Sequence, residues 1–210
     1  MATPLRDPPA LHDRALQDLS FIRRTMEGAS AFTDVPGWGL VLIGATAVGA
    51  AVLSSGAATA AAWFGTWMAE AVLAAALGMA MLWRKMRRRA REGAPFSVPA
   101  RKFLLGLLPA IAAGAVLTFA LLDRAVLAEA QPVAALPRAL PGLWLLLYGA
   151  AVVTAGMNSV RAVPLMGLTL MATGTLTLLV PGLDPEWMLG AGFGGVQAGF
   201  GLWIARRHGG

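Results

Sequence analysis

Long apolar runs alternate with short polar breaks along this chain, and the lengths of the runs are the most informative feature. A helix needs about 20 mostly apolar residues to cross the hydrocarbon core of a bilayer, within a range of about 17 to 25. Six runs meet this requirement. The sequence therefore predicts an all-α, polytopic membrane protein with six transmembrane helices at Gly37–Ser54, Ala60–Trp83, Phe103–Leu122, Pro141–Met157, Pro164–Val180 and Met188–Ile204.

The composition agrees with this fold class and narrows the chemistry. Hydrophobic residues make up 57% of the chain and charged residues 13%, whereas a soluble domain is nearer one quarter charged. The absence of cysteine excludes disulfides, thiolate chemistry and cysteine-based metal sites. We expect a cytoplasmic N-terminal segment over residues 1–36, a transmembrane domain over 37–204 and a cytoplasmic tail over 205–210.

The basic residues are distributed unequally between the two sides of the predicted membrane. Fifteen of the 17 Lys and Arg residues fall in the two termini and the even-numbered loops, and eight of these lie between Arg84 and Lys102; only Arg124 and Arg138 fall on the other side. Positive charge holds loops in the cytoplasm. The pattern predicts a multi-pass protein of the bacterial inner membrane with both termini cytoplasmic, although the short fourth and fifth runs would also fit one re-entrant pair.

Residues 11–27 have the periodicity of an amphipathic helix that precedes the membrane. Leu11, Ala15, Leu19, Ile22 and Met26 recur at helical spacing on one face. The segment carries three basic and three acidic residues, whereas a lipid-binding helix is usually rich in Lys and Arg. This balance favours a protein partner that binds Leu19, Ile22 and Met26, with the inner leaflet and the chain's own 84–102 loop as alternatives.

A weak internal repeat relates the first and fourth runs. Pro36-Gly37 and Pro141-Gly142 open them 105 residues apart, and at the same offset Gly44 matches Gly149. A duplication with three spans in each half would invert the halves, as in many transporters. The alternative is a chance alignment, because helices rich in Ala, Gly, Leu and Val align readily.

Glu70 is the one ionisable residue at membrane depth, and it is a functional candidate for that reason. Trp63 and Trp67 share its helix face. The competing interpretations are that Glu70 reaches the membrane interface, or that it hydrogen-bonds Thr or Asn side chains on other helices. Other polar residues within or next to the runs complete a candidate intramembrane polar site, either as links between helices or as a polar path with Glu70: Asn158, Thr169, Thr173, Thr177 and Gln197.

The last run is rich in glycine. Gly190 with Gly194, and Gly195 with Gly199, form pairs of small residues four apart that let helix backbones approach closely. The neighbouring helix would belong to this chain or to another. The pattern Gly-x-Gly-x-x-Gly from Gly190 is not a dinucleotide site, because no strand precedes it.

No catalytic, metal-binding or cofactor-binding constellation is found. His12 and His208 are the only histidines, and both lie in the tails. Intramembrane hydrolysis or lipid transfer would need a Ser/His pair, an Asp pair or an H-E-x-x-H motif. Nucleic-acid binding by the basic loop is not expected either, since no reading module accompanies it.

Three stretches resemble an uncharacterised family of small six-helix bacterial membrane proteins. The first runs from Leu19 through Ile22-Arg23 and Met26-Glu27 to Phe32-Thr33 and Val35-Pro-Gly-Trp-Gly39; the others are Pro141–Gly149 and the closing Gly194–Gly210, with Ala205-Arg-Arg-His-Gly-Gly. The resemblance implies a six-helix fold and a similarity to membrane companions of cytosolic regulators. It implies no activity and no site residues.

These observations lead to two functional hypotheses. The first is a non-enzymatic integral membrane protein that acts through a protein partner or a second copy, as an accessory subunit or as an anchor or sensor for a cytosolic regulator. The second is a small-solute or proton-coupled transporter that uses Glu70. An enzyme acting within the membrane ranks third.

Overall fold

The computed structural model describes residues 16, 18–22, 35–91, 98–123, 131–157 and 159–208. Six of its helices are long and apolar enough to cross a membrane, so the prediction of an all-helical, multi-pass membrane protein is confirmed for the described residues. The helices are α2 (Gly37–Ser55), α3 (Ala60–Arg91), α4 (Val98–Leu121), α6 (Ala139–Gly156), α7 (Ala162–Leu179) and a composite last helix, formed by α8 (Pro185–Leu189), η2 (Gly190–Val196) and α9 (Gln197–His208).

Local sequence explains where several helices begin and end. Pro141 and Pro164 lie in the first turns of α6 and α7, where the missing N–H has no helical partner. The Asp184 carboxylate caps α8 by accepting a hydrogen bond from the Glu186 backbone N–H at 3.0 Å, and Pro185 opens that helix. Gly182 follows α7 with a φ of 90°, a conformation that favours glycine.

Several helices extend beyond the predicted spans: α4 begins at Val98 instead of Phe103, and the last helix runs from Pro185 to His208. The second helix continues past Trp83 to Arg91, because its basic extension consists of residues with high helix propensity. The last helix contains a π-helical segment, η2, which the sequence pattern did not predict. Because α6 and α7 are each 18 residues long and apolar enough to cross a membrane, two full spans are favoured over the re-entrant alternative.

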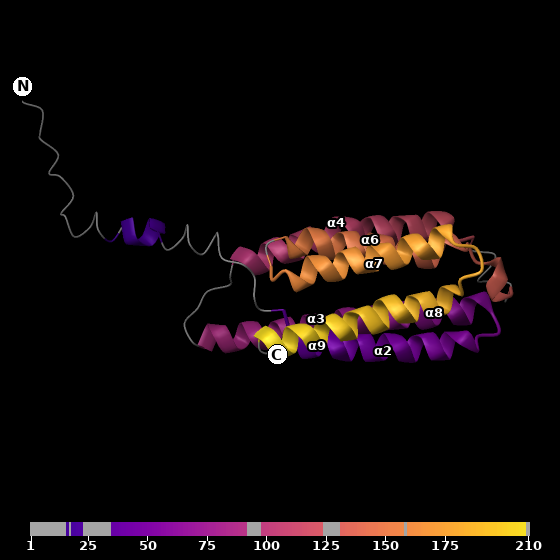
Figure 1. Ribbon diagram of the computed structural model, residues 1–210, viewed down its shortest axis with the longest axis horizontal. Helices are drawn as coiled ribbons and strands as arrows, with labels where there is room; N and C mark the ends of the chain where they lie inside the picture. The colour runs from indigo at the N-terminus through magenta and orange to yellow at the C-terminus, as the bar shows by residue number, and fades with distance from the viewer. Residues whose placement is uncertain are drawn as a thin grey trace, which may run out of the picture.

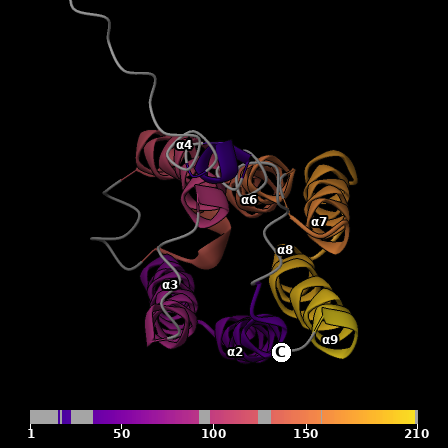
Figure 2. The ribbon, with the colours of Figure 1, turned by 90° about the vertical axis from the view of Figure 1, so that its left-hand side faces the viewer.

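The six spans lie around an open ring in the order of the sequence, and among the described residues α3 and α4, at its open side, make little or no backbone contact with each other (Figure 2). Helix α2 packs between α3 and the last helix, and α6 packs between α4 and α7; α7 also contacts the last helix. Seen from the side, these two sets form two layers (Figure 1). Among the described elements, the extensive backbone contacts of α3 are with α2 and those of α4 are with α6.

An aromatic cluster joins the two layers. The rings of Trp63 on α3 and Trp144 on α6 stack with their centroids 5.9 Å apart, and Trp67 lies 6.4 Å from Phe193 on η2. Tyr148 of α6 contacts Phe193 edge to face at 5.4 Å. Trp63 and Trp67 are both buried by these contacts.

The two ends of the bundle carry different charge. Asp123, Asp184 and Glu186 lie at the end where α3 and α8 begin, with Arg138 as the basic residue described there. We call it the acidic end. The opposite end, which we call the basic end, has these exposed cations among the described side chains: Arg84, Arg87, Arg101, Lys102, Arg161, Arg206 and Arg207.

Candidate functional site

Glu70 lies inside the bundle and is hydrogen-bonded across a helix interface. It is 9% exposed, and the Thr46 hydroxyl of α2 lies 2.9 Å from its Oε1 atom. Glu70 is ten residues from the start of α3, about 15 Å along the axis at 1.5 Å per residue. That distance is about half of a 30 Å hydrocarbon core. The hydrogen bond to Thr46 confirms the interpretation in which Glu70 bonds a threonine on another helix, and this depth argues against the one in which Glu70 reaches the membrane interface.

The Thr46 hydroxyl group faces two acceptors and has one proton. Its oxygen lies 2.8 Å from the Ile43 carbonyl oxygen and 2.9 Å from Glu70 Oε1. If Glu70 is ionised, the hydroxyl can donate to only one of the two at a time. If Glu70 carries a proton, the carboxyl group donates to Thr46 and Thr46 donates to Ile43. Both contacts are then proper hydrogen bonds, so this geometry suits a carboxyl group that can hold a proton.

Gln197 adds a second polar group at the same depth. It is 3% exposed, and its Oε1 atom is buried without a hydrogen-bond partner. The Trp67–Phe193 ring contact fixes the relative level of the two helices. Glu70 and Gln197 follow this contact by three and four residues on helices that both run toward the basic end. Glu70 and Gln197 therefore lie at one level, on the two helices that flank α2.

The threonine stripe of α7 does not join this polar layer by any hydrogen bond that the structure shows. The hydroxyl groups of Thr169, Thr173 and Thr177 each donate to the backbone carbonyl four residues earlier on the same helix, at 2.8 to 2.9 Å. Their single protons are used within α7. The stripe therefore gives neither the predicted bonds between helices nor a bonded path to Glu70. Asn158 lies outside the described residues.

Glycines bring the last helix against α2 along one side. A Cβ atom built on Gly44 would lie 2.6 Å from the Gly194 carbonyl oxygen, and one built on Gly201 would lie 2.8 Å from the Gly37 carbonyl oxygen. A Cβ on Gly190 would meet the Ala51 side chain at 2.9 Å. We call this side of the last helix, formed by Gly190, Gly194 and Gly201, the closed face. Predicted close packing is thus confirmed for Gly190 and Gly194.

A similar arrangement joins α6 to α7. Glycines seven residues apart on α6, at Gly142 and Gly149, meet Gly174 and Gly167 of α7. A Cβ on Gly149 would lie 2.7 Å from the Gly167 carbonyl oxygen, and one on Gly174 would lie 2.7 Å from that of Gly142. Backbone therefore touches backbone in both helix pairs, which is how helices associate where lipid removes the hydrophobic driving force.

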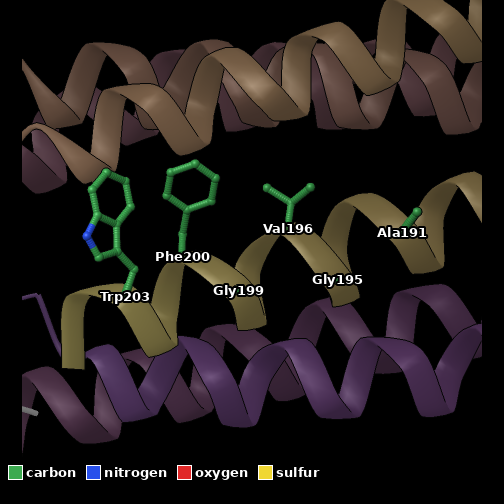
Figure 3. A pocket seen from close by; sticks show the side chains of 6 residues that line it. All are labelled: Ala191, Gly195, Val196, Gly199, Phe200 and Trp203. Atoms are coloured by element: carbon green, nitrogen blue, oxygen red, sulfur yellow. The ribbon is translucent and has the colours of Figure 1, made fainter. Parts of the chain in front are cut away.

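The other predicted glycine pair, Gly195 and Gly199, has no close neighbour among the described residues. A Cβ atom on Gly195 or Gly199 would meet nothing within 4 Å. Both residues belong to an apolar groove of about 430 Å³ on the last helix. In Figure 3 the side chains of Val196, Phe200 and Trp203 extend from this helix toward the other layer, while the two glycines leave the backbone bare. We call this side the open face; it is lined by Ala191, Gly195, Val196, Gly199, Phe200 and Trp203.

The predicted partner-binding residues are only partly described. Leu16 and residues 18–22 are helical, and Leu19 and Ile22 are 63% and 52% exposed. Met26 lies outside the described residues, as does most of the 11–27 segment, so its amphipathic helix stays a prediction.

Two buried polar contacts escaped the sequence analysis. Thr46 is the sole hydroxyl residue between Gly37 and Leu53, and that isolation was the available signal for a partner of Glu70. The Trp144 indole N–H donates to the Thr118 hydroxyl at 2.8 Å and links α6 to α4. Nothing in the spacing of Thr118 distinguishes it from the threonines of α7, which bond only their own helix.

Comparison with family models, curated proteins and solved structures finds no match to this chain. The resemblance of three stretches to six-helix bacterial membrane proteins accordingly stays a prediction.

Proposed function

We propose that this protein is non-enzymatic and acts through a protein partner that binds its N-terminal segment, as an accessory subunit or as a membrane anchor for a cytosolic regulator. The observation that supports this is the exposure of Leu19 and Ile22 on a helical segment that precedes the first span. Exposed side chains of this size leave about 1.5 to 3 kcal/mol of burial each for a partner to recover. The balanced charge of residues 11–27 makes anionic lipid a poor sole occupant.

The proposal includes a topology in which the basic end faces the bacterial cytoplasm. Exposed cations gather at that end and acidic side chains at the other, which fits the rule that positive charge is retained inside. Reporter fusions after Arg91 and after Gly210 are expected to read as cytoplasmic. A periplasmic signal from either fusion would contradict this orientation and would put the N-terminal segment out of reach of a cytosolic partner.

Co-purification tests the partner directly. In mild detergent, Leu19→Asp with Ile22→Asp is expected to lose the proteins that co-purify with the wild type, because two charges replace apolar contacts. The matched control, Leu19→Met with Ile22→Met, keeps apolar area and is expected to retain them. Both variants should insert into the membrane normally, since the spans are untouched. Equal co-purification by the aspartate variant would overturn the proposal.

A proton-coupled transporter is the second candidate, and the Glu70–Thr46 contact supports it. A carboxyl group at mid-membrane depth, next to a hydroxyl that lies within hydrogen-bond distance of two acceptors, is suited to take up and release a proton. Gln197 provides an unpaired acceptor at the same level. The 3+3 inverted repeat adds no support to this candidate. A rotation that inverts one half relative to the other would make the two halves run in opposite directions around the ring. Here the helices of both halves follow one another in the same direction.

Glu70→Gln separates this candidate from a structural role. A transporter predicts that the variant folds but loses pH-driven solute uptake in proteoliposomes, because an amide cannot carry the proton. The control Glu186→Gln, at the acidic end, is expected to keep uptake. Wild-type proteoliposomes that show no pH-driven flux, or a Glu70→Gln variant that transports normally, would remove this candidate.

A further inference from the structure

The open face is a groove along the middle and the basic end of the last helix. Its lining runs from Ala191 to Trp203, twelve residues, which is about 18 Å along a helix. The hydrocarbon of one leaflet is about 15 Å thick. Nearer the acidic end the same helix is enclosed instead, since α8 packs on α2, α6 and α7. An acyl chain whose headgroup lies at the basic end can follow this lining to the level of Gln197, near the middle of the bundle.

The groove is apolar along its length and ends beside positive charge. Trp203, the lining residue nearest the basic end, has the Arg207 guanidinium group over its ring at 5.8 Å from the centroid. Arg206 precedes Arg207, and both side chains are exposed. A tryptophan with adjacent arginines is typical of the membrane interface, where anionic headgroups attract basic residues. The apolar length and the cations thus match the two parts of one amphiphile.

Open space at the two glycines makes room for a lipid acyl chain. A Cβ atom on Gly195 or Gly199 would have no described atom within 4 Å, so an acyl chain can lie directly on the backbone there. Val196 and Phe200 form one wall of the groove, as Figure 3 shows. We propose that the open face binds one anionic phospholipid, with an acyl chain over Gly195 and Gly199 and its phosphate beside Arg206 and Arg207.

Lipid binding to the delipidated, purified protein tests this site. Native mass spectrometry would count adducts with phosphatidylglycerol and with phosphatidylcholine of identical acyl chains. The wild type is expected to bind one phosphatidylglycerol about tenfold or more tightly than phosphatidylcholine, as two arginines near a headgroup predict. Arg206→Gln with Arg207→Gln should abolish that preference and leave phosphatidylcholine binding unchanged.

A variant that fills the groove distinguishes the contribution of the acyl chain to binding from that of the two arginines. Gly195→Leu with Gly199→Leu should remove the specific adduct for both lipids. The matched control, Gly49→Leu with Gly65→Leu, alters two other exposed glycines that have nothing within 4 Å, and it should bind like the wild type. Retained phosphatidylglycerol preference in the filled variant would overturn the proposal. So would a wild type without preference, or a wild-type dimer that the filled variant converts to a monomer, because a second copy would then be the occupant.

Discussion

The closed and open faces of the last helix both carry glycines, but those of the closed face pack against α2 and those of the open face meet no described residue. Gly194 and Gly195 are adjacent in sequence, yet a Cβ on the first would lie 2.5 Å from the Val48 side chain and one on the second would meet nothing. The difference lies in the neighbour: α2 presents Gly37, Gly44 and Ala51 at seven-residue intervals, level with the glycines of the closed face. Close helix packing therefore requires small residues on both helices at matching levels, not a stripe on one.

The largest effect is expected at Gly201 on the closed face. In Gly201→Leu the new side chain would start 2.8 Å from the Gly37 carbonyl oxygen and the Val41 nitrogen, which are backbone atoms that cannot turn aside. Forcing α2 away should lower the free energy of unfolding by about 3 kcal/mol or more. Unfolding in mild detergent, followed by the loss of helical circular dichroism, measures this. An unchanged midpoint would mean that α2 does not lie against α9.

An intermediate effect is expected at Gly194. A methyl group in Gly194→Ala would meet the Val48 side chain, which can change its rotamer, and would lie 3.2 Å from the Gly44 carbonyl oxygen. The higher helix propensity of alanine offsets part of the strain. We expect a net loss of about 1 kcal/mol in the free energy of unfolding. A gain in stability would show that the last helix packs less closely on α2 at Gly194 than these distances indicate.

The smallest effect, with the opposite sign, is expected at Gly199. It lies only two residues from Gly201, but on the open face, so Gly199→Leu creates no clash within the chain. Because leucine favours a helix more than glycine does, the free energy of unfolding should rise by up to about 1 kcal/mol in detergent. A loss comparable to that of Gly201→Leu would erase the distinction between the two faces.

These two faces also show what could be predicted from the sequence. Hydropathy and run length were enough for six spans, because crossing a bilayer is a requirement on composition and length. Which helices pack against each other could not be predicted from the sequence, because Leu, Val and Ala fit equally well against lipid and against another helix. The glycine spacing predicted close helix packing at Gly190 and Gly194, where the structure has it. It predicted the same at Gly195 and Gly199, where no described residue lies close.

The polar site was predictable to a similar degree. A single carboxyl group in a span is conspicuous, so Glu70 was found from sequence. Its partner Thr46 was not, because a hydroxyl group can bond its own helix, as Thr169 does, and only the packing of α2 on α3 decides otherwise. The π-helical segment η2 was also beyond sequence reasoning, since its glycines fit an ordinary helix equally well.

A photoreactive benzoylphenylalanine in place of Phe200, an aromatic residue that lines the groove, tests the central claim that the open face meets lipid without filling the space at the glycines. Its ketone reacts with C–H bonds of any neighbour, so irradiation in native membranes reports what covers the face. We expect the dominant product to be a covalent phospholipid adduct, with most of it carrying an anionic headgroup. The same label at position 65, on an exposed part of α3, should give adducts in the proportions of the bulk lipids. A crosslink from position 200 to α2 or to a second copy, without any lipid adduct, would contradict the account.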